Sequence, residues 1–460
     1  MRDAAPAQRG ADRLEWLRAA AADGSVEEVV VAVPDLAGRL LGQRLDVGYF
    51  LSRVAADGLG ACVYLLAVDV DMTTDTSTPP GYAIDATALG YGDLVLRPDL
   101  ATLRLTPWDP GTALVVADAV MPDGAEIPVA PRAVLRGQLE RLRRLELTAL
   151  AGVELEFLLF GGTYAEAHAR GYRGLTPASR HNVDYALTGL EGFEPVVRRI
   201  RREMRAAGLR MESARGEVHP GQYEIVFRYA DALSTCDQAV LYKSGARQIA
   251  AAEGAALTFL AKYDGGEGSS GHVHLSLRGA DGTPVLAGDG PHGMSPVMQH
   301  FVAGQLACLR ELTLLFAPTV NSYKRLAPGA FAPTKVAWGP DNRLTPVRVV
   351  GRGENLRIEH RVPGADVNPY LAVAAIVAAG LHGIENELPL EPPTWGEPDD
   401  ARPSLPESLR DAVDAWERSE VASAAFGPDV VAHYATAGRR EWTAFSRAVT
   451  DWELARGFER

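Results

Sequence analysis

Short alternating apolar segments dominate the first quarter of the chain. They are bounded by Gly, Pro and Asp and are rich in β-branched residues, which is typical of strands. Such segments occupy residues 26–35, 40–47, 94–99, 101–108 and 112–120. We therefore predict a small sheet-rich domain over residues 13–120, preceded by a short helix over 12–24 and a flexible tail over 1–12.

Helical spacing of apolar residues becomes common after a turn-rich linker at residues 121–131. Leucines and charges recur at helical intervals over 133–147, and helices are also predicted over 369–388 and 406–420. Strand-like segments alternate with these helices. The second domain, residues 132–460, is therefore expected to mix helices and strands, so the fold class is α+β.

One long segment, residues 69–93, has neither kind of periodicity. It reads DVDMTTDTSTPPGYAIDATALGYGD, which is polar and interrupted by Pro and Gly. An irregular loop of this length in a compact domain is usually functional.

Composition describes an ordinary globular protein without a nucleic-acid partner. The 460 residues carry a net charge of −13, which opposes binding to phosphate backbones. The three cysteines, Cys62, Cys236 and Cys308, lack paired or metal-binding spacing and are expected to be reduced. No apolar run approaches the ~20 residues of a membrane span, so we expect a cytoplasmic protein.

Polar side chains alternate with apolar ones in four strand-like segments. Because strand side chains alternate between faces, the polar residues of each segment share one face. The polar positions are Glu154 and Glu156; His272, His274 and Ser276; Arg357, Glu359 and Arg361; and Glu217 with Glu224 on either side of a His-Pro-Gly turn.

Two interpretations of these segments stay open. Each polar face could simply be exposed to solvent. Alternatively, Glu154 and Glu156 would repel each other unless a cation lies between them, and carboxylates with one or two imidazoles suit Mg²⁺ or Mn²⁺. His272 shares its face with His274 and follows a glycine-rich run, which favours a metal site. The remaining histidines considered are expected to be structural: His219, His292, His300 and His433.

The same segments, in the same order, resemble glutamine synthetase. The matching motifs are GVELEF, GEVHPGQYE, GSSGHVHLSL, NSYKRLAPG with a following NR, RIEHRVPG and NPYLAVAAIVAAGL, between residues 152 and 381. The resemblance implies an N-terminal β-grasp domain and a catalytic domain whose antiparallel strands form an open funnel. It also implies a homo-oligomer of two stacked hexameric rings with active sites between subunits.

The resemblance implies roles for individual residues of the site. Two or more Mg²⁺ or Mn²⁺ ions would be held by Glu156, Glu217 and Glu224 and by Glu154, His272 and Glu359. Glutamate would be held by Gly268, Arg325 and Arg361. The transferring phosphate would be neutralised by Arg343 and Arg357, and ATP would be contacted by Glu212, Tyr229, His274, Ser276 and Arg357.

The implied chemistry activates a carboxylate for amide formation. The γ-carboxylate of glutamate takes the γ-phosphate of ATP, and an amine then attacks the acyl phosphate. Metals and arginines supply the neutralisation that phosphoryl transfer requires.

Two departures from the family concern the amine. Ammonia-using members carry a glutamate in a Gly-Tyr-Glu-Ala-Pro loop, and this chain has Phe331 there. Their Asp-Gly-Ser-Ser segment is also missing from residues 72–85. A phenyl ring offers an apolar wall or a cation–π face. We therefore predict a glutamate–amine ligase for a primary amine other than ammonia, with ethanolamine favoured over a polyamine.

Several questions stay open at this point. The proton of the amine could be accepted by any of four carboxylates: Asp71, Asp75, Asp85 and Glu267. The alternatives to an amine ligase are an ordinary glutamine synthetase and a non-catalytic sensor of glutamate or nucleotide. A guanidino kinase is disfavoured by the RIEHR and NSYKR motifs. The segment 385–400 has no tyrosine for adenylylation, so no such regulation is expected.

Overall fold

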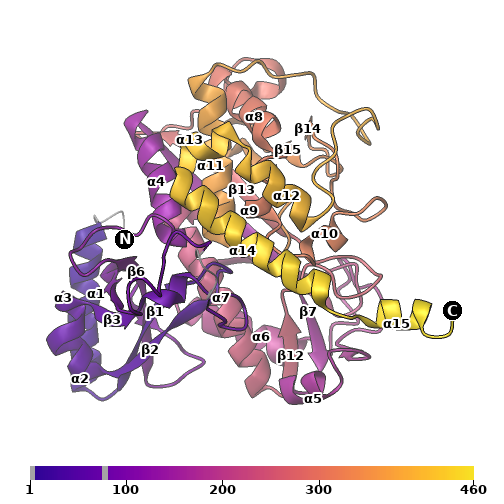
Figure 1. Ribbon diagram of the computed structural model, residues 1–460. Helices are drawn as coiled ribbons and strands as arrows, with labels where there is room; N and C mark the ends of the chain where they lie inside the picture. Colours follow the sequence, from indigo (N-terminus) through magenta and orange to yellow (C-terminus); the bar gives the residue numbers. More distant parts are fainter. Residues whose placement is uncertain (1–5, 75–80) are drawn as a thin grey trace.

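Two sheets and a layer of helices make up the fold, which is α+β as predicted. The computed structural model describes residues 6–74 and 81–460. The first sheet lies at the lower left of Figure 1, and most of the remaining chain surrounds the second sheet. Among the described residues, no helix combines the length and the apolar character needed to cross a membrane.

The first sheet has the strand order β2-β1-β6-β4-β3, with β5 also paired to β6. Its central pair, β1 and β6, is parallel, and its other pairs are antiparallel. The strands are β1 (Glu28–Pro34), β2 (Leu40–Asp46), β3 (Leu59–Cys62), β4 (Asp93–Pro98), β5 (Arg104–Leu105) and β6 (Thr112–Val120). The predicted strand over 101–108 is shorter than expected because a 3₁₀ turn, Leu100–Thr102, precedes it.

Helices on this part of the chain differ from prediction in their extent. Helix α1 spans Pro6–Ala22, so it begins well before the predicted start, and residues 1–5 of the predicted tail lie outside the described residues. Two short helices, α2 (Val47–Tyr49) and α3 (Ala55–Asp57), follow β2. The predicted irregular loop contains no helix or extended strand over its described residues up to β4.

The second sheet forms the floor of the site. Its order is β14-β15-β16-β13-β7-β10-β9, and every pair is antiparallel except β14 with β15. The long strand β7 (Leu147–Gly161) lies between β13 and β10 and also pairs with three short strands. The other bounds are β8 (Thr176–Pro177), β9 (Met211–Gly216), β10 (Gln222–Phe227), β11 (Ala230–Asp231), β12 (Ala255–Thr258), β13 (Gly271–Gly279), β14 (Trp338–Pro340), β15 (Val347–Val350) and β16 (Arg357–His360).

Helices cover the second sheet and enclose a large apolar core. Helix α11 (Pro369–Glu385) is almost entirely buried because it packs against α4 (Pro131–Arg144), α7 (Ala232–Ala252) and α8 (Pro296–Cys308). The predicted helices over 133–147, 369–388 and 406–420 are thus confirmed as α4, α11 and α12. The remaining helices are α5 (Tyr164–Ala169), α6 (Glu194–Ala206), α9 (Thr313–Phe316), α10 (Ser322–Arg325), α12 (Leu409–Glu417), α13 (Glu420–Phe426), α14 (Pro428–Arg447) and α15 (Asp451–Gly457).

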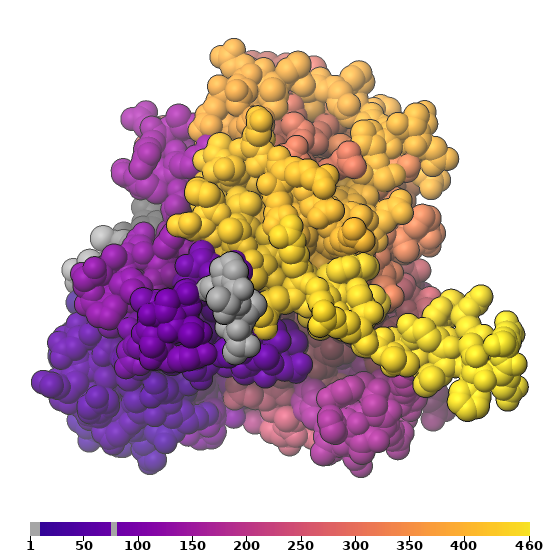
Figure 2. Space-filling model, viewed as in Figure 1, coloured from indigo at the N-terminus to yellow at the C-terminus, as the bar shows by residue number. Residues whose placement is uncertain are grey.

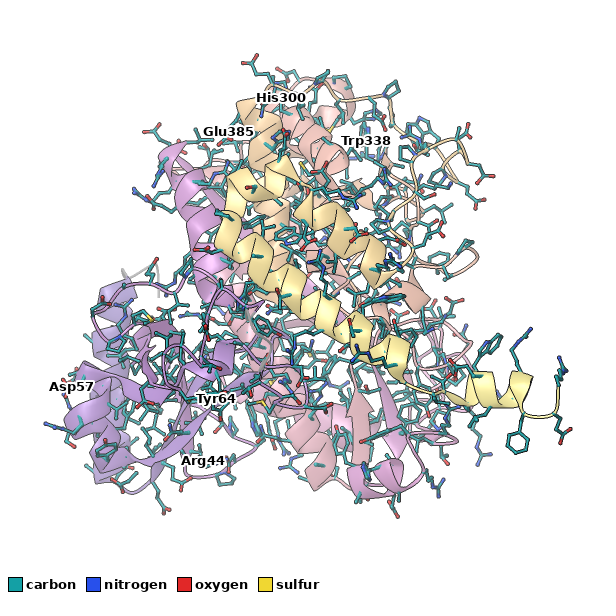
Figure 3. All side chains as sticks on the ribbon, in the orientation of Figure 1. Arg44, Asp57, Tyr64, His300, Trp338 and Glu385 are labelled. Carbon is teal, nitrogen blue, oxygen red and sulfur yellow. The ribbon has the colours of Figure 1, made fainter. Side chains whose placement is uncertain are left out.

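Polar contacts join the parts of the chain. At the upper end of Figure 3, Glu385 of α11 forms an ion pair with Arg141 of α4 at 3.0 Å. Nearer the first sheet, the buried Arg132 at the start of α4 contacts Asp118 of β6 at 2.5 Å and Asp237 of α7 at 2.9 Å. A buried arginine needs such partners because an unpaired charge there is costly. The predicted domain boundary at residues 121–131 falls between β6 and α4 and remains a prediction.

Candidate active site

The register of three strands brings the predicted polar residues together. On the central strand β7, Glu154 lies opposite His272 of β13, and Glu156 lies opposite Glu224 of β10. Farther along β13, His274 lies opposite Glu359 of β16. Paired residues in neighbouring strands point to the same face, so the alternating polar positions converge on one side of the sheet. Glu156, Glu217, Glu224, His272 and Glu359 are also buried, so the solvent-exposed alternative is wrong for them.

The first cluster consists of three buried carboxylates. Oxygen atoms of Glu156, Glu217 and Glu224 lie within 4.8 Å of one another. Burial and the charge of Glu156 raise the pKa of Glu217 to about 8, and burial with the charges of Glu154 and Glu156 raises the pKa of Glu224 to about 9. Three buried oxygen donors at this spacing fit a hard divalent cation, which would replace the protons.

Neighbouring groups hold the first cluster in place. The Gln222 side-chain amide and the Ser270 backbone N–H donate to Glu156 at 2.9 and 2.8 Å, and the Ser270 hydroxyl also donates to it. On the other side, the guanidinium of Arg215 contacts Glu217 at 2.5 Å and Glu224 at 3.2 Å. The orientation of Glu156 is thus fixed before any cation arrives, which favours a preorganised site.

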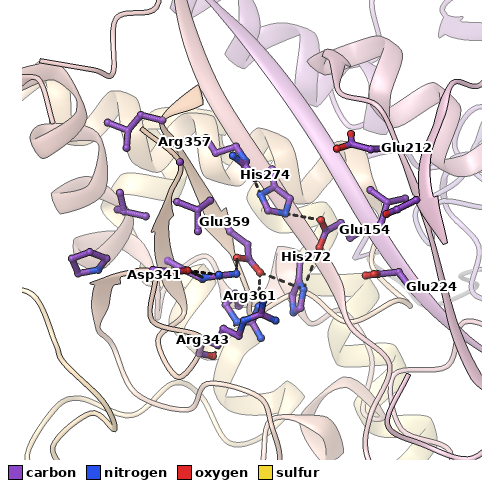
Figure 4. A pocket seen from close by; sticks show the side chains of 18 of the residues that line it. Glu154, Glu212, Glu224, His272, His274, Asp341, Arg343, Arg357, Glu359 and Arg361 are labelled. Atoms are coloured by element: carbon purple, nitrogen blue, oxygen red, sulfur yellow. Dashed lines mark hydrogen bonds and ion pairs between the residues drawn. The ribbon is translucent and has the colours of Figure 1, made fainter. Parts of the chain in front are cut away.

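The second cluster combines carboxylates with imidazoles (Figure 4). Donor atoms of Glu154, His274 and Glu359 lie within 4.8 Å of one another. His272 lies between the two carboxylates, with its Nδ1 atom 3.7 Å from Glu154 and 3.5 Å from Glu359. The tight group thus contains His274 where the resemblance implies His272, although both imidazoles lie beside Glu154. The Nε2 atom of His272 is buried without a hydrogen-bond partner among the described residues.

The carboxylates of the second cluster stay ionised, in contrast to Glu217 and Glu224. Burial opposes ionisation of Glu359, but the nearby charges of His272 and Arg361 lower its pKa to about 2. Burial likewise opposes ionisation of Glu154, but hydrogen bonds from His272 and His274 lower its pKa well below the ordinary value. Mixed carboxylate and imidazole donors fit a divalent cation.

Arginines surround the second cluster. Arg348 donates to Glu359 at 2.7 Å, and Arg361 donates to the other oxygen of the same carboxylate. On the far side, Arg357 lies 3.2 Å from Nδ1 of His274. The buried Arg325 donates to the carbonyl oxygens of Val362 and Arg361, and burial lowers its pKa to about 10. It therefore remains cationic at neutral pH.

Three adjoining cavities contain every predicted site residue. The largest, about 990 Å³, is lined by both clusters, by Glu212 and by the arginines at 343, 357 and 361. A second cavity of about 220 Å³ shares Glu154, Glu212, His274 and Arg357 with it, and is lined in addition by Tyr229 and Ser276. A third of about 70 Å³ shares Glu156, Glu217, His272, Phe331 and Arg361, and is lined in addition by Gly268 and Arg325. The two smaller cavities thus divide the predicted residues, with Tyr229 and Ser276 of the nucleotide set in one and Gly268 and Arg325 of the glutamate set in the other.

The four candidates for the amine base differ in whether they line the cavities of the site. Glu267 lines the smallest cavity. Neither Asp71 nor Asp85 lines any of the three cavities, and Asp75 lies outside the described residues. Within this chain, only Glu267 of the described candidates therefore borders the site.

Most histidines expected to be structural are held by local contacts or burial. His219 contacts Asp264 at 2.8 Å, His300 contacts the Leu388 carbonyl oxygen at 2.9 Å, and His433 is fully buried. His292 is different, because it lines the largest cavity.

Two arginines that contact the carboxylate clusters were not predicted from the sequence. Arg215 lies two residues before Glu217, and this spacing could have marked it as part of the same polar ladder. Arg348 has no such signal, because it reaches Glu359 only through the pairing of β15 with β16.

We expect Mg²⁺ to stabilise the protein more at high pH than at low pH. The pKa values of Glu217 and Glu224 rise from 4.5 to about 8 and 9 on folding, so the folded chain holds more protons than the unfolded chain across this window. Without a cation, the free energy of unfolding therefore falls as pH rises from 4.5 through the folded-state pKa values of about 8 and 9. The rise in thermal midpoint on adding Mg²⁺ should be larger at about pH 9 than at about pH 6. Equal rises would contradict the assignment of these carboxylates as ligands.

Comparisons with known proteins agree with this geometry. Residues 128–457 match the glutamine synthetase catalytic domain. The chain is 55% identical to gamma-glutamylethanolamide synthetase GlnA4 of Streptomyces coelicolor, covering 97% of this chain and 96% of that protein. It is 36% identical to a glutamate–isopropylamine ligase of Pseudomonas, covering 94% and 95%. A solved complex of GmaS with ADP has a TM-score of 0.83 at 29% identity, covering 96% of this chain and 99% of that one.

Proposed function

This chain belongs to the glutamine synthetase family, and we propose that it is an ATP-dependent ligase that joins the γ-carboxylate of L-glutamate to ethanolamine. The product would be a γ-glutamyl amide, with ADP and phosphate released. Support comes from the two clusters of hard-cation ligands and from the similarity to amine ligases. A polyamine is the next substrate to consider. A cytoplasmic location and assembly into a dodecamer of two hexameric rings remain predictions.

Each end of the site has a role in the first step. Arg325 and Arg361 would hold the carboxylates of glutamate, with Gly268 approaching its backbone. On the opposite side, Glu212, Tyr229 and Ser276 would contact the nucleotide. The γ-carboxylate oxygen attacks the γ-phosphorus, the bond to the β-phosphate oxygen breaks, and ADP leaves.

Charge neutralisation makes this transfer possible. Two divalent cations bound by the clusters would neutralise the phosphate oxygens. Arg343 and Arg357 line the same cavity and would neutralise the transferring group, whose charge is spread over three oxygens. Arg361 is tied to Glu359, so a glutamate-binding arginine and a metal ligand are held in fixed relation.

The observation that carries the choice of amine is the position of Phe331. This residue is 64% exposed and lines the cavities that Glu156 and Glu217 also line, where ammonia-using members carry a glutamate. A phenyl ring lacks the carboxylate that would pair with ammonium, and its face stabilises any cation by only ~0.5–2 kcal/mol. Its apolar surface can in addition contact an alkyl chain, which ammonium does not have. An alkylamine is therefore favoured over ammonium.

A panel of amines tests this proposal. Phosphate release would be measured with glutamate, ATP and Mg²⁺ and with ammonium, methylamine, ethanolamine, isopropylamine or putrescine. We expect kcat/KM for ethanolamine to exceed that for ammonium by about 10-fold or more, the ratio given by roughly 1.4 kcal/mol. Equal or better turnover with ammonium would indicate an ordinary glutamine synthetase. Binding of ATP without phosphate release for any amine would indicate a non-catalytic sensor.

A further inference from the structure

Two loops far apart in sequence meet at the smallest cavity of the site. The carboxylate of Glu267 accepts a hydrogen bond from the backbone N–H of Phe331 at 3.4 Å. Both residues line the cavity that Gly268, Arg325 and Arg361 also border. A carboxylate and an exposed aromatic residue thus border the same cavity, together with the residues proposed to hold glutamate.

The other carboxylates of this cavity already have strong partners. Glu156 accepts hydrogen bonds from Gln222 and Ser270, and Glu217 is paired with Arg215. Glu267 differs, because across residues 6–74 and 81–460 the Phe331 amide is the only group that donates to its carboxylate. One of its oxygens is therefore free for a ligand.

From this arrangement we infer that Glu267 binds the ammonium group of the incoming amine while Phe331 packs against its carbon chain. The inference rests on the proposed function and names the residue pair that selects the amine. A carboxylate recognises a cation through a charge-assisted hydrogen bond, and an aromatic ring adds a weaker attraction. Together they suit a small amine that has both a positive end and carbon atoms.

The same carboxylate can receive the proton that amide formation releases. A primary amine with a pKa near that of lysine, about 10.4, enters mainly as R–NH₃⁺ at neutral pH. One proton must leave before the nitrogen lone pair can attack the carbonyl carbon of the acyl phosphate. The C–N bond then forms, the bond from this carbon to the phosphate oxygen breaks, and phosphate leaves with the electron pair. Glu267 is placed to accept this first proton, and the second proton, which leaves the nitrogen as the amide forms, can pass to the departing phosphate.

A rival explanation assigns Glu267 to the glutamate substrate. Glu267 could instead bind the α-ammonium group of glutamate, which must also lie near Gly268. The two roles predict changes in KM for different substrates. The titratable and charged side chains lining this cavity, besides Glu267, are Glu156, Glu217, His272, Arg325 and Arg361.

The test compares Glu267→Gln with the wild type in the full-length protein. Phosphate release would be measured with ethanolamine and with hydroxylamine, which is uncharged at neutral pH and needs no ammonium site. Losing a charge-assisted hydrogen bond should raise KM for ethanolamine about 10- to 100-fold. KM for glutamate and ATP and the rate with hydroxylamine should change by less than about 3-fold. The defect with ethanolamine should shrink as pH approaches the amine pKa, because the free base then dominates in solution.

Asp264, on the same loop as Glu267, provides a control variant. Asp264→Asn removes a carboxylate from the same loop that faces His219 instead, and it should leave the ethanolamine-to-hydroxylamine rate ratio unchanged. Glu267→Asp, which keeps the charge, should restore part of the ethanolamine activity. An unchanged ratio in Glu267→Gln, or a rise in KM for glutamate alone, would overturn the inference. If the wild type prefers ammonium, the proposed function fails, yet the rate ratio of the preferred amine to hydroxylamine still reports on Glu267.

Discussion

Replacing Glu156 with alanine is expected to reduce kcat about 10²- to 10³-fold or more while the protein stays folded. Glu156 belongs to the first cluster, in which its carboxylate lies within 4.8 Å of those of Glu217 and Glu224. Without it, a divalent cation would lose one of three protein ligands, and the charge on the transferring phosphate would be less neutralised. Phosphate release at saturating Mg²⁺ measures the loss.

The matched variant for this experiment is Glu156→Gln. Alanine leaves the hydroxyl and the backbone N–H of Ser270 without their acceptor, which costs ~1–3 kcal/mol for each buried group left unsatisfied, whereas the Gln222 amide keeps the Gly268 carbonyl oxygen. Glutamine keeps an acceptor oxygen at this position but removes the charge, so it separates ligation from packing. Both variants should lose activity, with a circular dichroism spectrum like that of the wild type. Activity retained in either variant at ordinary Mg²⁺ concentrations would show that Glu156 does not bind an essential cation.

Replacing Phe331 with glutamate is expected to shift preference toward ammonium. The new carboxylate would stand beside Glu267 and provide a second acceptor for a small cation, while the apolar surface for the carbon chain is lost. A charge-assisted hydrogen bond contributes ~1.5–3 kcal/mol, so kcat/KM for ammonium relative to ethanolamine should rise roughly 10- to 150-fold. Product analysis with each amine measures this ratio.

Phe331→Leu provides the control for losing the ring without gaining a charge. It should lower kcat/KM for ethanolamine about 3- to 10-fold, as expected from the loss of a cation–π contact, without improving the use of ammonium. If Phe331→Glu leaves the ratio at its wild-type value, the phenyl ring has no part in choosing the amine.

The floor of the site could be predicted from the sequence because it depends on local alternation. Glu154 and Glu156 lie on the same face of their strand however it pairs with its neighbours, and the same holds for His272 and His274. The family motifs then indicated that these segments belong to one active site. Pairing between strands is a long-range property, so the contact of Arg348 with Glu359 across β15 and β16 could not be read from either segment.

Loops were harder to predict for the same reason. Four carboxylates qualified as candidates for the amine base, and nothing in their local sequence ranked Glu267 above Asp71 or Asp85. Glu267 differs from them because it lines a cavity together with Phe331, which belongs to a different loop. Likewise, the helical start at Pro6 could not be predicted because residues 1–12 have no clear apolar periodicity.

Direct competition between two amines tests the central claim most sharply. The protein would be incubated with glutamate, ATP, Mg²⁺ and equal concentrations of ammonium and ethanolamine, and both amides would be quantified by mass spectrometry at low conversion. The ratio of products equals the ratio of the two kcat/KM values. We expect γ-glutamylethanolamide to exceed glutamine by about 10-fold or more. Glutamine as the main product would contradict it.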